Sequence, residues 1–392
     1  MQQNDSKQRL EILIKREFPS LEKMIYVNHA AISPWPRVTA DAMAAFADEN
    51  LQSGSLHYPS WLQRQKHLRD RIAGMLNATG GEDIALLKNT SEGICIVANG
   101  IDWKDGDNIV TARGEFISNQ LAWQALSAKG VELRKVDILN CDDPESALLN
   151  AMDDRTRVLT VSSVQWNSGF RLDLRKLGKA CRNSNTLFFV DAIQQFGALQ
   201  IDVQDCGIDV LAASAHKWMM GPEGIAIFYC NAKTRKKLVL RQYGWLMLND
   251  PFRYDLPDRE PTSSARRFEA GTPNNIGQAG LFASLGLLSD VGHEVVERLV
   301  LSNTAKLMAA LHQIKGVTVQ SRTETSRHSG IVSFAANGIE SEQLRRKLAK
   351  MNVHVAVRGS AVRLSPHFYQ CSETIDQLLN CIELAIRNDK IH

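Results

Sequence analysis

The stretch Phe188-Phe-Val-Asp-Ala-Ile-Gln decides the fold. It contains a short apolar run that ends at the carboxylate of Asp191. A second apolar run, Val210-Leu-Ala-Ala, leads to Lys217 in the segment Ser214-Ala-His-Lys, 26 positions after Asp191. Apolar runs of this length with polar residues at their ends are typical of buried strands in a parallel sheet. The two segments therefore predict successive strands that carry an acid and a lysine at their carboxyl ends.

The same pattern extends outward on both sides, from about residue 84 to residue 229. Further apolar runs begin at Ile109, Val158 and Ile225, and segments of helical period lie between the runs. Polar or aromatic residues such as Phe116 and Trp166 follow the carboxyl ends, where ligands of open α/β sheets bind. The sequence predicts an α/β fold whose large lobe holds a mostly parallel sheet covered by helices.

The last third of the chain has a different order of elements. Residues 246–267 are rich in Asp, Pro, Ser and Arg, which predicts a long loop or a lobe boundary. A helical segment follows to about residue 314, and short strand-like runs then alternate with helices. We expect a smaller α+β lobe. We place the large domain at residues 28–265 and the small domain at residues 1–27 with residues 266–392.

Composition narrows the class of protein. A chain of 392 residues with 44% hydrophobic content buries a large core, and its 46 basic and 43 acidic residues leave no broad basic field for nucleic acid or membrane. The seven cysteines form no CxxC pair, which favours reduced thiols and gives no metal site. The polar amino terminus and the lack of a long uncharged run place the protein in the cytoplasm, where its partner is a small-molecule substrate.

Lys217 and Asp191 are the two groups that pyridoxal phosphate (PLP) chemistry needs. A lysine holds the cofactor aldehyde as a Schiff base, and a buried carboxylate keeps the pyridine nitrogen protonated. The alternatives are a solvated lysine and an acid that caps the following helix. Ser214 and His216 beside the lysine favour the cofactor site, and Gln194 could donate to the phenolic oxygen of the cofactor.

A phosphate site is predicted at Lys88-Asn-Thr-Ser-Glu-Gly, where small hydroxyl residues begin an apolar helix. Backbone amides at a helix amino terminus bind phosphate well. The alternative is an ordinary capping box formed by Asn89 and Glu92. Both interpretations can hold together, because Thr90 and Ser91 would remain free for the phosphate.

Two further side chains suit a cofactor or a substrate. Phe116 could stack on the pyridine ring, although an aromatic residue after a strand is more often part of the core. Arg363 follows a short strand in the second lobe and could hold a substrate carboxylate through two parallel hydrogen bonds. A surface salt bridge is the alternative for Arg363.

Assembled, these pieces resemble the class V aminotransferase family of PLP enzymes, which includes cysteine desulfurases, kynureninases and isopenicillin N epimerase-like proteins. The resemblance spans nearly the whole chain, from Tyr26-Val-Asn-His-Ala-Ala to Arg363-Leu-Ser-Pro-His-Phe-Tyr. Its most specific parts are the match that starts at Asp191 and ends at Gln194 and the match that runs from Ser214 to Lys217. The resemblance implies an aspartate aminotransferase-like fold, with a seven-stranded type of sheet.

Residue by residue, the resemblance implies Lys217 as the Schiff-base lysine, Asp191 opposite the pyridine nitrogen and Gln194 near the phenolic oxygen. Phe116 takes the place of the stacking histidine of the desulfurases. The threonine of the Gly-Thr-Pro motif, Thr272, would reach the phosphate of a neighbouring subunit, which implies a homodimer with shared active sites. The residues implied to hold phosphate within the chain are Thr90, Ser91, Ser214 and His216.

Two departures from the family pattern bear on the reaction. Desulfurases carry a catalytic cysteine between their counterparts of Arg358 and Arg363, and here that interval is only Gly359-Ser-Ala-Val. We therefore expect that the protein is not a cysteine desulfurase. Trp166 stands where the desulfurases have a cofactor-contacting asparagine; Asn167 could supply that contact, and Trp166 could shape an apolar pocket.

The expected chemistry starts when Lys217 moves a proton at the substrate α-carbon. Deprotonation leads equally to transamination, epimerisation or elimination. We predict an aminotransferase on the breadth of the family, with a lyase or an epimerase, similar to C-S lyases or to isopenicillin N epimerase, as the alternative. A binding module without turnover has no need of the Schiff-base lysine, and a nucleotide-dependent enzyme is disfavoured because the chain lacks GxGxxG and GxxxxGK[ST] motifs.

Overall fold

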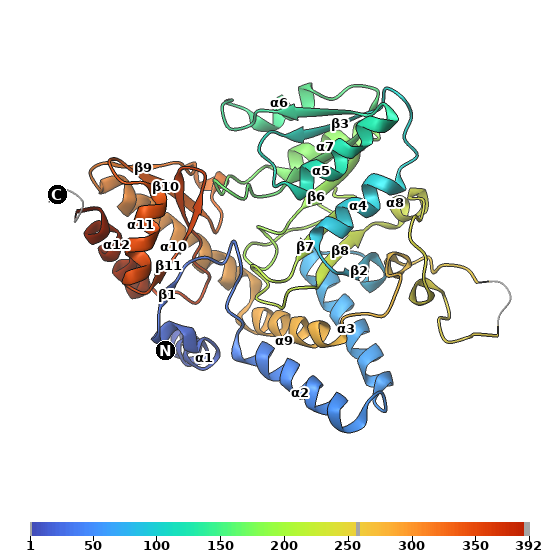
Figure 1. Cartoon of the computed structure of the whole chain (residues 1–392), viewed down its shortest axis with the longest axis horizontal. Helices are drawn as coiled ribbons and strands as arrows, with labels where there is room; N and C mark the ends of the chain where they lie inside the picture. Colours follow the sequence, from blue (N-terminus) through green and yellow to red (C-terminus); the bar gives the residue numbers. More distant parts are fainter. Residues whose placement is uncertain (1, 256–258, 388–392) are drawn as a thin grey trace.

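The large lobe is built around a seven-stranded sheet in the order β2-β8-β7-β6-β5-β3-β4 (Figure 1). The structure is a computed structural model and describes residues 2–255 and 259–387. All neighbouring strands of this sheet are parallel except β8, which is antiparallel to β2 and β7, so the predicted mostly parallel sheet is confirmed. The strands are β2 (Ile84–Leu87), β3 (Asn108–Ala112), β4 (Glu132–Val136), β5 (Thr156–Ser162), β6 (Leu187–Asp191), β7 (Val210–Ser214) and β8 (Ala226–Cys230).

Helices cover both faces of this sheet, which explains why its central strands are apolar at every position. In β6, Phe188 packs into a cluster with Leu68 and Leu177, whereas the next residue, Phe189, packs into a second cluster with Ile94 and Trp123 on the opposite face. The helices that supply these contacts and their neighbours in the lobe are α3 (Tyr58–Leu76), α4 (Thr90–Gly100), α5 (Ser118–Gln124), α6 (Pro144–Asn150), α7 (Leu174–Ser184) and α8 (Ala232–Lys237).

The smaller lobe is α+β, as predicted, and lies beside the large sheet (Figure 1). Its antiparallel four-stranded sheet has the order β12-β13-β10-β9, and β1 pairs with β11 in parallel. The strands are β1 (Ile25–Tyr26), β9 (Val317–Val319), β10 (Val332–Ala336), β11 (Val353–His354), β12 (Ala356–Arg358) and β13 (Ala361–Leu364). Helices α10 (His293–Gln313), α11 (Ser341–Lys350) and α12 (Ser372–Arg387) close its own apolar core.

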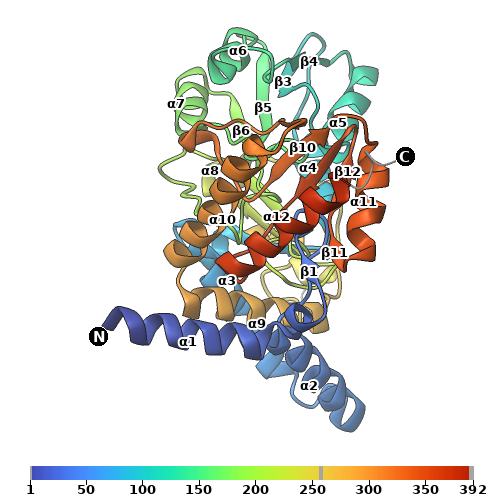
Figure 2. The same ribbon diagram turned by 90° about the vertical axis from the view of Figure 1, so that its left-hand side faces the viewer.

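Three long helices lie along one side of the molecule: α1 (Gln2–Glu17), α2 (Arg37–Ser53) and α9 (Asn275–Val291). Helix α9 packs on α2 and α3, and α1 lies near them (Figures 1 and 2). Leu281 and Leu285 of α9 belong to the large-lobe core, whereas the predicted helical segment is broken at Gly292, before α10. The domain limits 28–265 and 1–27 with 266–392 stay a prediction, but this packing ties α9 to the large lobe.

Short 3-10 helices and irregular segments connect the longer elements. In residues 2–255 and 259–387 the 3-10 helices are η1 (Pro19–Glu22), η2 (Gly81–Asp83), η3 (Ala125–Lys129), η4 (Trp245–Met247), η5 (Ala265–Phe268) and η6 (Thr325–Arg327). The predicted loop 246–267 is irregular between η4 and η5, and residues 256–258 lie outside the described part. Among the helices that the structure describes, none is long and apolar enough to cross a membrane. The cytoplasmic location stays a prediction.

Candidate active site

A cavity of about 410 Å³ lies at the carboxyl ends of β6 and β7, and residues of both lobes line it. This is the edge where the apolar runs were predicted to deliver their polar residues. Nine of the ten predicted site residues line the cavity, and Thr272 does not. The nine are Thr90, Ser91, Phe116, Asp191, Gln194, Ser214, His216, Lys217 and Arg363.

Asp191 is the last residue of β6 and is only 2% exposed. Its Oδ1 accepts a hydrogen bond of 3.0 Å from the backbone N–H of Ile193, and within the described residues Oδ2 has no partner. Burial raises the pKa of the Asp191 carboxyl, and the nearby Glu115 adds to this shift. A buried acid of this kind needs a cation or a strong donor, and a pyridine N–H would supply one.

Lys217 extends from the segment after β7 into the same cavity. Its Nζ lies 5.7 Å from the centroid of the Phe116 ring. Burial lowers the pKa of the Lys217 amine; the charge of Asp191 opposes this shift, and the charges of two arginines add to it. The lysine therefore has a larger neutral fraction near neutral pH than a solvated lysine, and only the neutral amine can form an imine.

The backbone around Lys217 is fixed from two sides. The Ser33 hydroxyl donates to the Lys217 carbonyl at 2.5 Å, and His367 Nε2 lies 2.9 Å from the Trp218 carbonyl oxygen. Ser33 lies just before α2, and His367 follows β13 of the small lobe. Both contacts hold the lysine-bearing turn in place, so the amine does not depend on a flexible loop for its position.

The predicted phosphate-binding segment lies at the start of α4. Asn89 Oδ1 accepts from the Glu92 N–H at 2.9 Å, and Glu92 Oε2 accepts from the Lys88 N–H at 2.7 Å, so the helix start is capped by these side chains. The Ser91 hydroxyl donates to Ser118 Oγ at 2.8 Å, and both residues line the cavity. An oxyanion would find hydroxyl groups and the amino end of a helix here.

Thr90 differs from expectation because its hydroxyl is already engaged. Its N–H donates to Ser214 Oγ at 2.9 Å, and the Ser214 N–H donates to Thr90 Oγ1 at 3.0 Å. This reciprocal pair ties the start of α4 to the end of β7. Its effect is to hold the two predicted phosphate segments together, and the phosphate roles of Thr90 and Ser214 stay predictions.

Gln194 is held at both ends of its amide. Nε2 donates to the Ala30 carbonyl at 3.0 Å, and Oε1 accepts from Trp218 Nε1 at 3.0 Å. The amide nitrogen carries a second hydrogen, and Gln194 lines the cavity. That hydrogen is the one available for a phenolic oxygen, so the predicted contact is compatible with the geometry.

Phe116 and Trp166 form an aromatic wall. Their ring centroids are 5.7 Å apart at an interplanar angle of 76°, and Trp166 Nε1 donates to the Gly114 carbonyl at 2.9 Å. Phe116 is 44% exposed, so it faces the cavity and is not a core residue. Asn167 does not line this cavity, and its Oδ1 accepts a hydrogen bond from the Ser168 N–H. The structure therefore gives no support to the expectation that Asn167 contacts the cofactor in place of the asparagine of the desulfurases.

Arg363 is 1% exposed, so the alternative of a surface salt bridge does not hold. Its Nη1 donates to the Trp166 carbonyl at 2.6 Å, while its Nε and Nη2 are buried and have no partner in the part of the chain that the structure describes. Burial lowers the pKa of Arg363, and the charge of Arg358 lowers it further. Two free N–H groups on one guanidinium match a carboxylate, which accepts two parallel hydrogen bonds.

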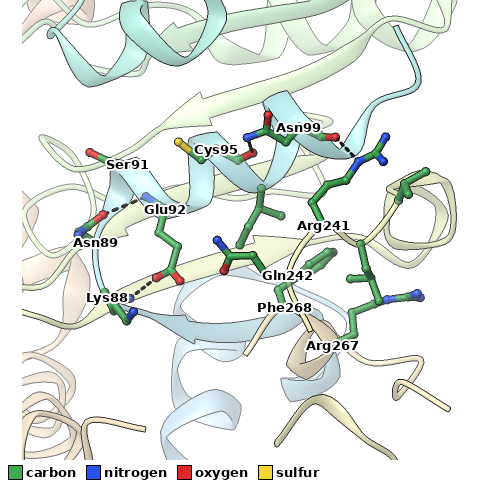
Figure 3. A pocket seen from close by; sticks show the side chains of 13 residues that line it. Lys88, Asn89, Ser91, Glu92, Cys95, Asn99, Arg241, Gln242, Arg267 and Phe268 are labelled. Carbon is green, nitrogen blue, oxygen red and sulfur yellow. Dashed lines mark hydrogen bonds between the residues drawn. The ribbon is translucent and has the colours of Figure 1, made fainter. Parts of the chain in front are cut away.

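Thr272 is exposed and lies in a separate hollow of about 320 Å³. Next to it, a cavity of about 350 Å³ borders α4 and shares Asn89 and Ser91 with the candidate site (Figure 3). In that cavity Arg241 Nε donates to the Asn99 carbonyl. A single chain therefore does not bring Thr272 to the other nine residues, and the predicted homodimer stays a prediction.

Arg358 and Ser118 also line the cavity, although sequence reasoning did not select them. The place of Arg358 depends on the register of the structure, in which Ala356, two residues before Arg358, pairs with Arg363. Glu115 lies just behind the cavity, where its Oε1 accepts from the Ser162 N–H at 2.8 Å; burial raises its pKa. The charge of Glu115 also raises the pKa of Asp191.

The donor set as a whole fits PLP. An amine, a buried acid with a free oxygen, a capped helix start with hydroxyl groups and an aromatic wall converge on one cavity. Arg363 adds two buried N–H groups that no described residue satisfies. Polar groups buried in this way are normally paired, so these N–H groups fit an anionic group of a ligand.

The chain is similar to proteins named as cysteine desulfurases and to a cystine C-S lyase. A probable cysteine desulfurase of Methanothermobacter thermautotrophicus is 30% identical over 395 residues, which cover 94% of this chain and 96% of the relative. The apo structure of the cysteine desulfurase from Thermococcus onnurineus NA1 has a TM-score of 0.85 at 25% identity and covers 96% of this chain and 98% of its own. The cystine C-S lyase C-DES, solved with its reaction product cysteine persulfide, has a TM-score of 0.86 at 25% identity and covers 94% and 99%.

These relatives contradict the predicted activity. We predicted an aminotransferase, with a lyase or epimerase as alternative, and excluded a cysteine desulfurase because no cysteine lies between Arg358 and Arg363. The relatives are named cysteine desulfurases and a C-S lyase. The predicted function, which excluded a cysteine desulfurase, was therefore wrong. The physical reason is that a protein thiol serves as an acceptor for sulfur, whereas a carbon–sulfur bond can also break by elimination, which needs a base at the α-carbon and no thiol.

The family model for class V aminotransferases matches residues 25–378, which include every residue that lines the candidate site. The match also contains both lobes, apart from the terminal segments. It confirms the resemblance found in the sequence and, with it, PLP as the predicted cofactor. The chain belongs to the class V aminotransferase family of PLP-dependent enzymes.

Proposed function

We propose that the protein is a PLP-dependent lyase that breaks the carbon–sulfur bond of cysteine or of a closely related sulfur amino acid. One observation carries the proposal: a buried acid, a lysine with a lowered pKa and a buried arginine with free N–H groups meet in a single cavity. The relatives' names supply the sulfur chemistry, because the cavity alone suits any amino acid.

Lys217 has two tasks in this proposal. Its amine would hold the cofactor, and it would remove the α-proton of the substrate. A bound cofactor would supply the group that withdraws electrons from the α-carbon. Asp191, whose Oδ2 has no partner among the described residues, would stabilise a positive charge on the pyridine nitrogen.

Arg363 orients the substrate. Its free Nε and Nη2 donate to the α-carboxylate, while the bond from Nη1 to the Trp166 carbonyl keeps the guanidinium in place. A bidentate grip fixes the carboxylate plane, and with it the direction of the bond to the α-hydrogen. This orientation would turn the α-hydrogen toward Lys217.

The bond changes balance without an external oxidant or reductant. The α-proton moves to Lys217 Nζ, the electron pair left at the α-carbon forms a double bond to the β-carbon, and the β-carbon–sulfur bond breaks. The sulfur leaves with its bonding pair as a thiolate or persulfide anion and takes up a proton. Hydrolysis of the three-carbon remainder gives pyruvate and ammonia.

The remaining predicted roles belong to the same proposal. A phosphate group would lie at the start of α4, near hydroxyl and imidazole groups, and the chain would act as a cytoplasmic homodimer in which Thr272 reaches the partner's phosphate. The exposure of Thr272 in its own hollow supports this role. The groups proposed around the phosphate are Thr90, Ser91, Ser214 and His216.

The activity is tested with purified protein saturated with PLP. Incubation with L-cysteine or L-cystine should release pyruvate, ammonia and sulfide or persulfide in equal amounts, and the Lys217→Ala variant should release none. Added keto acid should not change the rate. Keto acid formation that depends on an added acceptor, or loss of optical activity without sulfur release, would overturn the proposal.

A further inference from the structure

Two buried histidines, His29 and His367, lie behind the turn that carries Lys217. His29 precedes α2 and His367 follows β13, so the pair joins segments that are far apart in the sequence. Both residues are 0% exposed, and their ring centroids are 5.3 Å apart. The His367 ring also lies 5.5 Å from the ring of Trp218, the residue after Lys217. Because the buried nitrogens of an imidazole need partners, those partners define what each ring does.

The hydrogen bonds of His367 fix its tautomer. Its Nδ1 lies 2.8 Å from the backbone nitrogen of Phe368, which can only donate, so Nδ1 accepts and carries no proton. The proton of the neutral ring is then on Nε2, which donates to the Trp218 carbonyl at 2.9 Å. Burial lowers the pKa of His367 to about 4, although the bond to the Trp218 carbonyl opposes this shift. Near neutral pH the ring is therefore a neutral donor aimed at the backbone next to Lys217.

His29 has the opposite tautomer for the same reason. Its Nδ1 lies 2.7 Å from the Ser365 carbonyl oxygen, which can only accept, so Nδ1 carries the proton. Its Nε2 then accepts a hydrogen bond of 2.5 Å from the Tyr369 hydroxyl. The Tyr369 ring stacks on Phe18, with the centroids 3.7 Å apart. His29 thus holds the segment from Ser365 to Tyr369 at both ends, and His367 lies within that segment.

The same segment continues the strand of Arg363. His367 is four positions after Arg363, and between them the Ser365 N–H donates to the Val27 carbonyl at 2.7 Å. The His367 N–H donates to Gln370 Oε1 at 2.6 Å. One short connection, held by these bonds, therefore runs from the guanidinium proposed to bind the α-carboxylate to the turn that carries the lysine.

We propose that His367 is a positioning residue for Lys217. Through its bond to the Trp218 carbonyl it sets where the amine lies relative to the carboxylate bound by Arg363. A neutral imidazole suits this task, because one nitrogen accepts and the other donates in a fixed geometry. His29 supports His367 by holding its segment. The inference rests on the role of Lys217 as the base in the proposed function and deepens it.

The test measures removal of the α-proton without sulfur chemistry. The PLP-loaded enzyme is incubated in D2O with L-alanine, which has no sulfur leaving group, and exchange of the α-hydrogen is followed by proton NMR. His367→Leu should lower kcat for exchange by about 10- to 100-fold, because a base displaced by about 1 Å loses rate on this scale. KM should change by less than about threefold, since the guanidinium of Arg363 remains. His367→Gln, whose amide N–H can donate to the same carbonyl, should recover most of kcat.

His328→Leu is the matched control. His328 Nε2 also lies 2.7 Å from a backbone carbonyl oxygen, that of Thr323, but outside the cavity, so kcat should not change. An unchanged kcat in His367→Leu, or equal losses in His367→Leu and His367→Gln, would overturn the role of His367. Exchange of L-alanine without sulfur release from L-cysteine or L-cystine would contradict the lyase proposal alone. A wild-type enzyme without exchange would contradict the base role of Lys217, and this inference with it.

The tautomer of His367 is a readout that does not depend on turnover. In PLP-loaded protein labelled with nitrogen-15 at its histidines, long-range hydrogen–nitrogen spectra distinguish a ring protonated on Nε2 from one protonated on Nδ1. Near neutral pH, the signal that His367→Gln removes should be protonated on Nε2, and the signal that His29→Asn removes should be protonated on Nδ1. This measurement also decides the case if His367→Leu does not fold. A His367 protonated on Nδ1 alone could not donate to the Trp218 carbonyl, which would overturn the proposal.

Discussion

The two walls of the cavity differ in how their polar groups are satisfied. On the large-lobe wall, Thr90 and Ser214 bond each other reciprocally, and Asp191 Oδ1 is held by a backbone N–H. On the small-lobe wall, Arg363 keeps two buried N–H groups without a partner, and Arg358 bonds only its neighbour's carbonyl within the described residues. On the large-lobe wall the hydroxyl groups of Thr90 and Ser214 are satisfied and Asp191 Oδ2 has no partner within the described residues, whereas on the small-lobe wall it is the N–H donors of a guanidinium that have none.

This difference assigns separate tasks to the lobes. The large-lobe wall consists of strand ends and a capped helix start, which hold side chains rigidly and suit a cofactor that stays bound. The small-lobe wall consists of a hairpin with free donors, which suits a substrate that arrives and leaves. Substitutions on the first wall should therefore affect the cofactor, and those on the second should affect only the substrate.

The largest effect is expected for Lys217→Ala. Loss of the amine removes both the link to the cofactor and the base, and a general base alone contributes about 10²- to 10⁴-fold. Turnover and the visible absorption band of the bound cofactor should disappear together. Absorption spectra and a pyruvate assay check this, with exposed Lys236→Ala on α8 as the control. A Lys217→Ala protein that keeps both would remove the distinction between the walls.

Arg363→Met should lower kcat/KM by about 30- to 4,000-fold, because truncation of a buried charge that binds a ligand costs about 2–5 kcal/mol. The visible absorption band should remain at full strength, since Arg363 belongs to the small-lobe wall. Steady-state kinetics and a spectrum of the same preparation check both points. Loss of the band in this variant would show that the walls are not independent.

The pH dependence of cofactor capture tests the large-lobe wall before any substrate is present. Burial lowers the pKa of Lys217, so the neutral amine that attacks the aldehyde is available at a lower pH than in free lysine. The rate at which apoprotein combines with PLP should rise with pH and level off below the ordinary lysine value of about 10.4. Stopped-flow absorbance measures this rate; a rise only around the ordinary value would contradict the lowered pKa.

The same shift has a consequence for stability. Between the folded and the unfolded pKa of Lys217 the unfolded chain binds more protons, so the free energy of unfolding of the apoprotein gains a term that rises with pH. Lys217→Met should remove that term. Urea titrations of both proteins across this pH range measure the difference.

The smallest effect is expected for Ser214→Ala. The change leaves the Thr90 N–H and hydroxyl without their shared partner inside the protein, which costs about 1–3 kcal/mol of unfolding free energy. Urea denaturation of the apoprotein measures it. Ser60→Ala, which removes an exposed hydroxyl at the start of α3, should change stability by less than about 0.5 kcal/mol. Equal losses in both variants would mean that the reciprocal pair does not support the wall.

Much of the large lobe was predictable because its strands are buried on both faces and therefore appear as continuous apolar runs. Asp191 and Lys217 were predictable for the same reason, since each follows the carboxyl end of such a run. The apolar residues of β8 did not predict that this strand runs antiparallel to its neighbours. It follows from the connection after β7, which is too short for the crossover helix that a parallel strand requires.

The features that the sequence left open depend on contacts between distant segments. An apolar helix such as α9 does not reveal which lobe it packs on, and its contact with α2 joins parts of the chain far apart in sequence. The place of Arg358 depends on the register between β12 and β13. The bond between Thr90 and Ser214 likewise needs the ends of α4 and β7 to meet in space. The reaction was misjudged because a missing thiol says nothing about elimination.

The most direct test reduces the PLP-loaded protein with borohydride and locates the modified residue by mass spectrometry of its peptides. The phosphopyridoxyl group should be found on Lys217 and on no other lysine, and the Lys217→Ala protein should carry none. A modified lysine elsewhere, or no modified peptide in the wild-type protein, would contradict the assignment of the cofactor to the large-lobe wall.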